Sequence, residues 1–136
     1  MYRRIEDFLS YWDEHTAGTE KVLAALTDKS LSQSVGGDHR TLGRLAWHSV
    51  GTIVEMLERV GCKIDGPALD APVPATAAQI AKTYGQVSRK AAEFIKENWT
   101  DATLEEEDDM YGETWKRGVT LRALIHHEIH HRHTQQ

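Results

Sequence analysis

The sequence has little of what would point to secretion, a membrane or a disulfide framework. Its single cysteine, Cys62, excludes an internal disulfide and a zinc cluster built from several thiolates. The N-terminal residues carry charges where a signal peptide needs an apolar stretch. No later segment approaches the roughly 20 apolar residues that span a bilayer. We therefore expect a cytoplasmic protein with no membrane segment.

Charge of one sign does not dominate either. The chain has 21 acidic and 16 basic residues and a formal net charge of −5. No basic stripe interleaved with aromatic residues is present, so nucleic acid is not expected as a partner. The densest run of charge, residues 105–109, lacks the alternating spacing and the turning glycine of a calcium loop. The run predicts a solvated acidic loop.

What is present is helical periodicity. Apolar residues recur at steps of three and four along four segments, which is typical of amphipathic helices. Thr41, Thr76 and Thr120 stand where N-cap residues are expected, and Gly61 follows the second segment. The predicted helices cover residues 2–27, 42–60, 76–98 and 120 to near the C-terminus.

The segments between these helices show no convincing strands. Residues 28–38 and the proline-rich residues 61–75 are predicted loops, and within residues 99–118 only 110–115 could be a short extended piece. These connections are longer than an up-down-up-down bundle needs. We predict an all-α fold for residues 1–136: a single-domain four-helix bundle with long crossover connections.

Histidines near the C-terminus are the most informative residues. They form two i,i+4 pairs, His126/His130 and His127/His131, and such pairs stack on one helix face about 5 to 6 Å apart at Cβ. Two imidazoles at this distance can bind one divalent metal ion. Both faces of the helix are partly apolar, so the helical wheel does not choose between the two pairs.

A third ligand would have to come from another helix. Only His15 and His48 lie on other predicted helices. The apolar seam around His15 favours a core histidine. The position of His48 at the edge of its apolar stripe is by itself typical of a boundary histidine, but the need of the C-terminal cluster for a third ligand nominates it. We assign no metal-binding role to His39 or His133. Residues 127–131 also match the H-E-x-x-H metalloprotease pattern, but only five residues follow, and zincins usually take a further ligand downstream.

Two motifs together resemble the DinB/YfiT-like family. They are Leu45-Ala46-Trp47-His48 in the second helix and Ile125-His126-His127-Glu128-Ile129-His130-His131-Arg132 in the fourth. The family pattern has one histidine on helix two and an H-x-x-x-H pair before Arg-Gly-Gln on the last helix. The resemblance implies that His48, His127 and His131 are the metal ligands.

The resemblance also implies a fold, a cofactor and a class of activity. Members are four-helix bundles, often homodimers, whose three histidines hold nickel, zinc or another divalent ion. Relatives in the wider superfamily transfer low-molecular-weight thiols, isomerise thiol adducts or were proposed as hydrolases. The leading hypothesis is thus a metal-dependent enzyme acting on a small molecule, by thiol transfer or hydrolysis.

The alternative hypothesis is a noncatalytic metal-binding or stress-response protein whose ion is structural. The chain departs from the family pattern in one place, because Arg132 is followed by His133-Thr134-Gln135-Gln136 and not by Gly-Gln. We therefore expect a truncated or altered C-terminal end.

Overall fold

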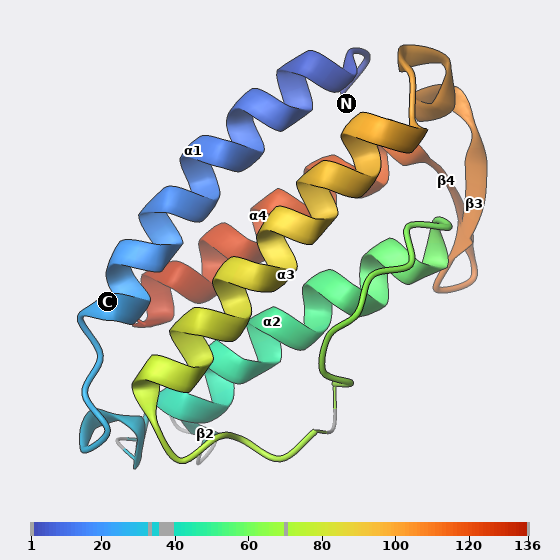
Figure 1. Cartoon of the computed structure of the whole chain (residues 1–136). Coiled ribbons are helices and arrows are strands. Elements are labelled where there is room, and N and C mark those ends of the chain that lie inside the picture. Colours follow the sequence, from blue (N-terminus) through green and yellow to red (C-terminus); the bar gives the residue numbers. More distant parts are fainter. Residues whose placement is uncertain (1, 33, 36–39, 70, 136) are drawn as a thin grey trace.

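The computed structural model describes residues 2–32, 34–35, 40–69 and 71–135, and the side chains of residues 2–32, 41–69 and 71–127. Four α-helices account for most of the described chain (Figure 1). The helices are α1 (Ile5–Ala24), α2 (Leu42–Arg59), α3 (Ala77–Asn98) and α4 (Arg117–Gln135). The predicted all-α four-helix bundle is therefore confirmed.

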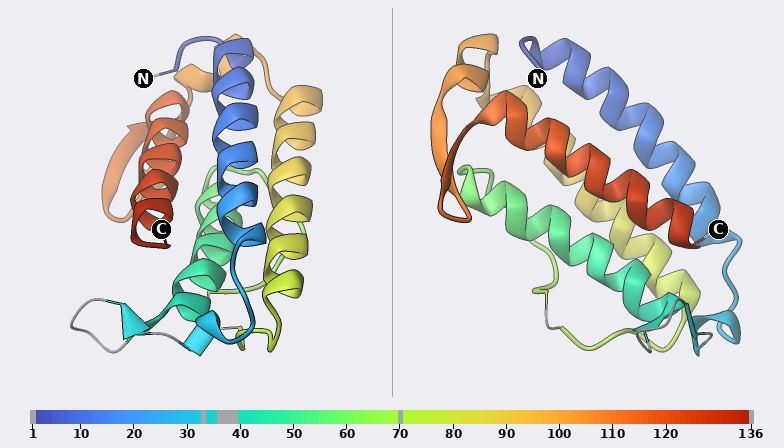
Figure 2. Two further views of the ribbon diagram at one scale, coloured as in Figure 1. Left: turned by 90° about the vertical axis from the view of Figure 1, so that its left-hand side faces the viewer. Right: turned by 180° about the vertical axis from the view of Figure 1, so that it is seen from behind.

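The helices pack in the order α1, α3, α2, α4 around the bundle. Helix α1 contacts α3 and α4, and α2 contacts the same two helices from the opposite corner. Figures 1 and 2 show that α2 and α3 run in the same direction, antiparallel to α1 and α4. Two consecutive parallel helices need a connection that returns along the bundle, and the chain between Arg59 and Ala77 does this. The predicted crossover is thus present.

Two of the three predicted helix caps are confirmed. The Thr41 hydroxyl accepts a hydrogen bond from the Arg44 backbone N–H at 3.1 Å, and Thr76 accepts one from the Gln79 N–H at 3.2 Å. The cap predicted at Thr120 is wrong, because α4 already begins at Arg117, where the preceding strand runs directly into the helix. Thr120 lies buried in the first turn of α4.

A β-hairpin joins α3 to α4. The sequence indicated only a possible extended piece at residues 110–115, which overlaps the turn and most of the second strand. Strands β3 (Glu107–Met110) and β4 (Glu113–Lys116) pair antiparallel after the short 3-10 helix η2 (Asp101–Glu105). Their connecting residues, Tyr111 and Gly112, have φ angles of 58° and 88°, as a tight two-residue hairpin turn requires. The strand residues are mostly charged. They do not alternate between apolar and polar, which is the sequence pattern that predicts a β-strand.

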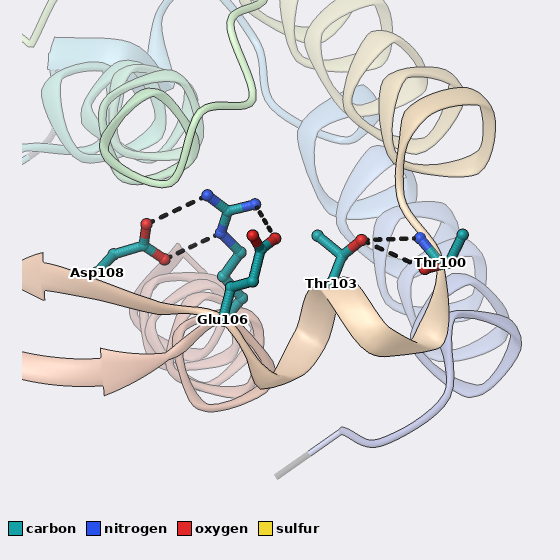
Figure 3. A network of polar contacts seen from close by, with 5 residues as sticks. Thr100, Thr103, Glu106 and Asp108 are labelled. Atoms are coloured by element: carbon teal, nitrogen blue, oxygen red, sulfur yellow. Dashed lines mark hydrogen bonds and ion pairs between the residues drawn. The ribbon is translucent and has the colours of Figure 1, made fainter.

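The acidic run at residues 105–109 extends from the end of η2 into strand β3 and is not simply a solvated loop. Asp108 is largely buried and accepts two hydrogen bonds from Arg117, at 3.0 Å from Nε and 3.3 Å from Nη2. The third nitrogen, Nη1, lies 3.1 Å from Glu106 Oε2 (Figure 3), and the guanidinium lies 5.2 Å from the centre of the Trp99 ring. Arg117 therefore ties the hairpin to the start of α4, which corrects the prediction for Asp108.

Shorter elements occupy the connection between α1 and α2. The 3-10 helix η1 (Ser30–Ser32) precedes two antiparallel two-residue strands, β1 (Ser34–Val35) and β2 (Arg40–Thr41), and β2 leads directly into α2. Within the described part of the chain, no helix combines the length and the apolar character that crossing a bilayer requires.

Candidate metal centre

Two of the three predicted metal ligands lie side by side. His48 on α2 and His127 on α4 have ring centroids 6.4 Å apart and ring planes at 58°. Both side chains are half-buried. They are 79 positions apart in the sequence and meet because α2 and α4 are packed neighbours. The third predicted ligand, His131, lies on α4, but its side chain is outside the described residues.

Local sequence explains why these rings meet. On α4, Leu121, Leu124 and Ile125 are buried and turn the helix so that His127 falls at the edge of the core. On α2, Ala46 and Val50 are fully buried, which leaves His48 at the boundary predicted from its stripe. A residue at such a boundary can reach a neighbouring helix without being enclosed by the core.

The two rings lie close to, but not at, the spacing of ligands to a shared ion. With metal–nitrogen bonds of about 2.1 Å and tetrahedral angles, two imidazoles that bind one ion have ring centroids about 5.3 Å apart. The observed 6.4 Å is about 1 Å longer, so binding would bring the two rings closer together. Among the described side chains there is no group of three or more histidine, cysteine or acidic residues placed to hold a metal ion.

The other histidines lie in different surroundings. His126 is exposed on α4, in contrast to half-buried His127. His15 is buried on α1, with its ring centre 6.0 Å from that of Trp12. The side chains of His39, His130 and His133 lie outside the described residues, as does that of Glu128, the base that a metalloprotease motif would need.

A cavity of about 510 Å³ opens beside the paired histidines. Its lining includes His48 and His127, the α2 residues Thr52 and Glu55, and Tyr111 from the hairpin turn. A volume of this order accommodates a small molecule. Sequence reasoning missed Glu55, although its position seven residues after His48 places it on the same helix face. It also missed Tyr111, because no sequence pattern indicated the hairpin.

Polar contacts fix the far wall of this cavity. The Tyr111 hydroxyl donates a 2.7 Å hydrogen bond to Glu55 Oε2, and Arg59 Nε donates to the other oxygen of Glu55. The Arg59 guanidinium also lies 4.2 Å from the centre of the Tyr111 ring. Tyr111 is exposed as a whole, but partial burial, followed by the contact with Glu55, raises its pKa to about 12. Tyr111 is therefore a neutral hydrogen-bond donor at physiological pH.

A second cavity, of about 460 Å³, lies further along α2 toward its N-terminus. It is lined by Arg44, Trp47 and His48 from α2 and by Leu69 from the crossover connection, among others. His48 and Leu69 line both cavities. His48 therefore lies between two cavities, each large enough for a small molecule.

Comparison with known proteins agrees with this architecture. The DinB family model matches residues 1–134. The uncharacterised protein YrdA of Bacillus subtilis (strain 168) is 38% identical over 132 residues, which cover 97% of this chain and 79% of YrdA.

A solved structure of similar sequence has the same fold. The crystal structure of a DinB-like protein from Bacillus cereus ATCC 10987 superposes with a TM-score of 0.95 at 41% identity, over 99% of this chain and 90% of the other. The match of the family model over nearly the whole chain, together with these relatives, shows that this protein belongs to the DinB family.

Proposed function

We propose that this DinB-family protein binds one divalent metal ion through His48, His127 and His131. The observation that supports the proposal is the approach of the His48 and His127 rings to 6.4 Å from two different helices. His131 follows His127 by one helical turn, so its Cα lies on the same side of α4. Three imidazoles suit nickel or zinc and leave coordination positions open.

The ion would serve an enzymatic reaction on a small molecule. Neutral ligands leave a divalent ion its full charge, so when bound it would lower the pKa of a water or thiol that it contacts. The chain supplies the cavity of about 510 Å³ beside His48 and His127, with the Tyr111 hydroxyl and the Glu55 carboxylate at its far wall. Thiol transfer from a low-molecular-weight thiol, or hydrolysis, fits such a site.

Metal analysis of histidine variants tests the ligand set. Untagged protein is stripped with chelator, reloaded with Ni²⁺ or Zn²⁺, and analysed for metal per chain. We expect His48→Ala, His127→Ala and His131→Ala each to lower metal affinity by more than about 100-fold, because changes outside the ligand shell alone cost about 10- to 100-fold. His126→Ala is the matched control, since His126 is adjacent on α4 but exposed. Unchanged metal content in His127→Ala, or equal loss in His126→Ala, contradicts the proposal.

The same preparations distinguish a catalytic from a structural ion. An ion that joins α2 to α4 for stability would be fully coordinated by protein, and its removal would unfold the chain. The core contains Ile53, Leu57, Leu121 and Leu124 as fully buried apolar residues of these two helices. We therefore expect the stripped protein to keep its helical circular dichroism and a cooperative thermal transition. Loss of both would favour the noncatalytic alternative.

A further inference from the structure

The described residues that line the cavity at the N-terminal end of α2 include a basic side chain. Acidic residues outnumber basic ones in the whole sequence, yet none is found among the described residues that line this cavity. Arg44 lines it, is exposed, and forms no ion pair with any described side chain. By contrast, Arg59 in the neighbouring cavity is paired with Glu55. Arg44 is thus a guanidinium that faces a cavity without a counter-charge among its described neighbours.

Trp47 supplies a second, independent observation in the same cavity. The side chain is 9% exposed, and its indole Nε1 is buried with no hydrogen-bond partner among the described residues. Trp12, another buried tryptophan, donates its Nε1–H to the Ser88 carbonyl at 2.9 Å. Buried donors are normally satisfied, so an orphaned one points to a missing acceptor. Trp47 lines the cavity, where a ligand could provide that acceptor.

We propose that this cavity binds one anionic group, a carboxylate or a phosphate, of a small molecule. The Arg44 guanidinium provides two parallel N–H donors, a geometry that matches either anion. Trp47, whose indole N–H has no acceptor among the described residues, lines the same cavity and would supply a further donor. Arg44 lies in the first turn of α2, where the helix dipole also favours negative charge.

The position of the cavity connects this anion to the proposed reaction. Leu69 crosses α2 so closely that a Cβ on Gly51 would lie 3.2 Å from the Leu69 Cα. Leu69 and His48 form the wall shared by the two cavities. A molecule whose anionic group contacts Arg44 could therefore place its reacting end beside His127. This last step rests on the proposed metal-dependent function, whereas the anion contact does not.

Nuclear magnetic resonance of metal-free protein tests the anion contact directly. The chain has four tryptophans, so labelling with ¹⁵N gives four indole N–H signals, and sequential assignment identifies that of Trp47. The probes are acetate, inorganic phosphate and, as a neutral analogue of acetate, acetamide. We expect acetate, phosphate or both to shift the Trp47 indole signal to saturation, and acetamide to leave it unchanged. Whichever anion binds identifies the ligand as a carboxylate or a phosphate compound.

Variants separate a specific site from general charge attraction. Arg44→Gln should raise the Kd of the bound anion about tenfold or more, because it removes charge-assisted hydrogen bonds. Lys90→Gln on α3 is the matched control: it removes one exposed positive charge elsewhere and should leave the Kd unchanged. Arg44 is exposed, so its replacement should not prevent folding.

Three results would overturn the proposal: no saturable shift with either anion, an equal shift with acetamide, or an unchanged Kd in Arg44→Gln. Because the titration uses metal-free protein, any of them leaves the histidine proposal intact. Conversely, anion binding together with unchanged metal content in His127→Ala would remove the metal proposal and keep the anion site.

Discussion

The two halves of the bundle are built differently. Between α1 and α3, aromatic residues fill the interior: Phe8 and Trp12 stack with ring centres 5.7 Å apart, and Tyr84 is fully buried. Between α2 and α4, half-buried His48 and His127 lie at the edge of the core, beside a cavity of about 510 Å³. The first half provides packing, and the second provides polar groups held on rigid helices. A preorganised site needs both, because a ligand set is only as precise as the scaffold that supports it.

The largest expected difference between the two halves concerns stability. Trp12→Ala should lower the free energy of unfolding by about 3 to 5 kcal/mol, because it removes a fully buried ring and leaves a cavity. His48→Ala should cost less than about 1 kcal/mol in metal-free protein, because a half-buried boundary residue is not enclosed by the core. Urea unfolding followed by circular dichroism measures both. If His48→Ala lowered the free energy of unfolding as much as Trp12→Ala does, His48 would be a core residue, and the two halves of the bundle would not differ in this way.

A second comparison sets the hairpin connection against an exposed ion pair at the same end of the bundle. Arg117→Gln should lower the free energy of unfolding by about 2 kcal/mol, because it leaves the largely buried Asp108 carboxylate without its partner. Arg4→Gln should cost no more than about 0.5 kcal/mol, since the Arg4–Glu6 pair is exposed. Equal costs would show that Arg117 does not hold the hairpin against α4.

The smallest expected effect is confined to the far wall of the metal-side cavity. The folded pKa of Tyr111 is raised above its usual 10 to about 12. The stability this contributes is therefore fully present below pH 10 and is lost as pH rises from 10 toward 12. In ultraviolet difference absorbance, Tyr111→Phe should remove the ionisation of one tyrosine near pH 12 that the native protein shows. Ionisation of Tyr111 at pH 10 would mean that its partial burial and its contact with Glu55 are absent in solution.

The sequence predicted those elements that depend on residues close together in the chain. Thr41 and Thr76 were recognised as caps because a cap acts on its own helix three residues away, and the four helices were recognised from their apolar stripes. Thr120 was misassigned because the hairpin before α4 left no pattern, being formed largely from charged residues. The partner of Asp108 is Arg117, nine residues away, and no local rule pairs them.

The candidate site shows the same division. The i,i+4 spacing identified two histidine pairs, and only the resemblance to the DinB/YfiT-like family selected His127 and His131. His48 was nominated because the pair needs a ligand from another helix, and the same resemblance supported it. The approach of His48 to His127 is observed in the structure. Arg44 and Tyr111 were not predicted, because their relevance depends on the crossover and the hairpin that complete the cavities. Contacts between elements distant in the chain are fixed by topology, which local patterns do not encode.

The most direct test of the central claim is a crystal structure of untagged, metal-loaded protein with anomalous data collected at the absorption edge of the added metal. The account predicts one strong anomalous peak between the rings of His48 and His127, within bonding distance of a nitrogen of each. An anomalous peak elsewhere, or none beside His48 in crystals of protein shown to contain metal, would contradict it.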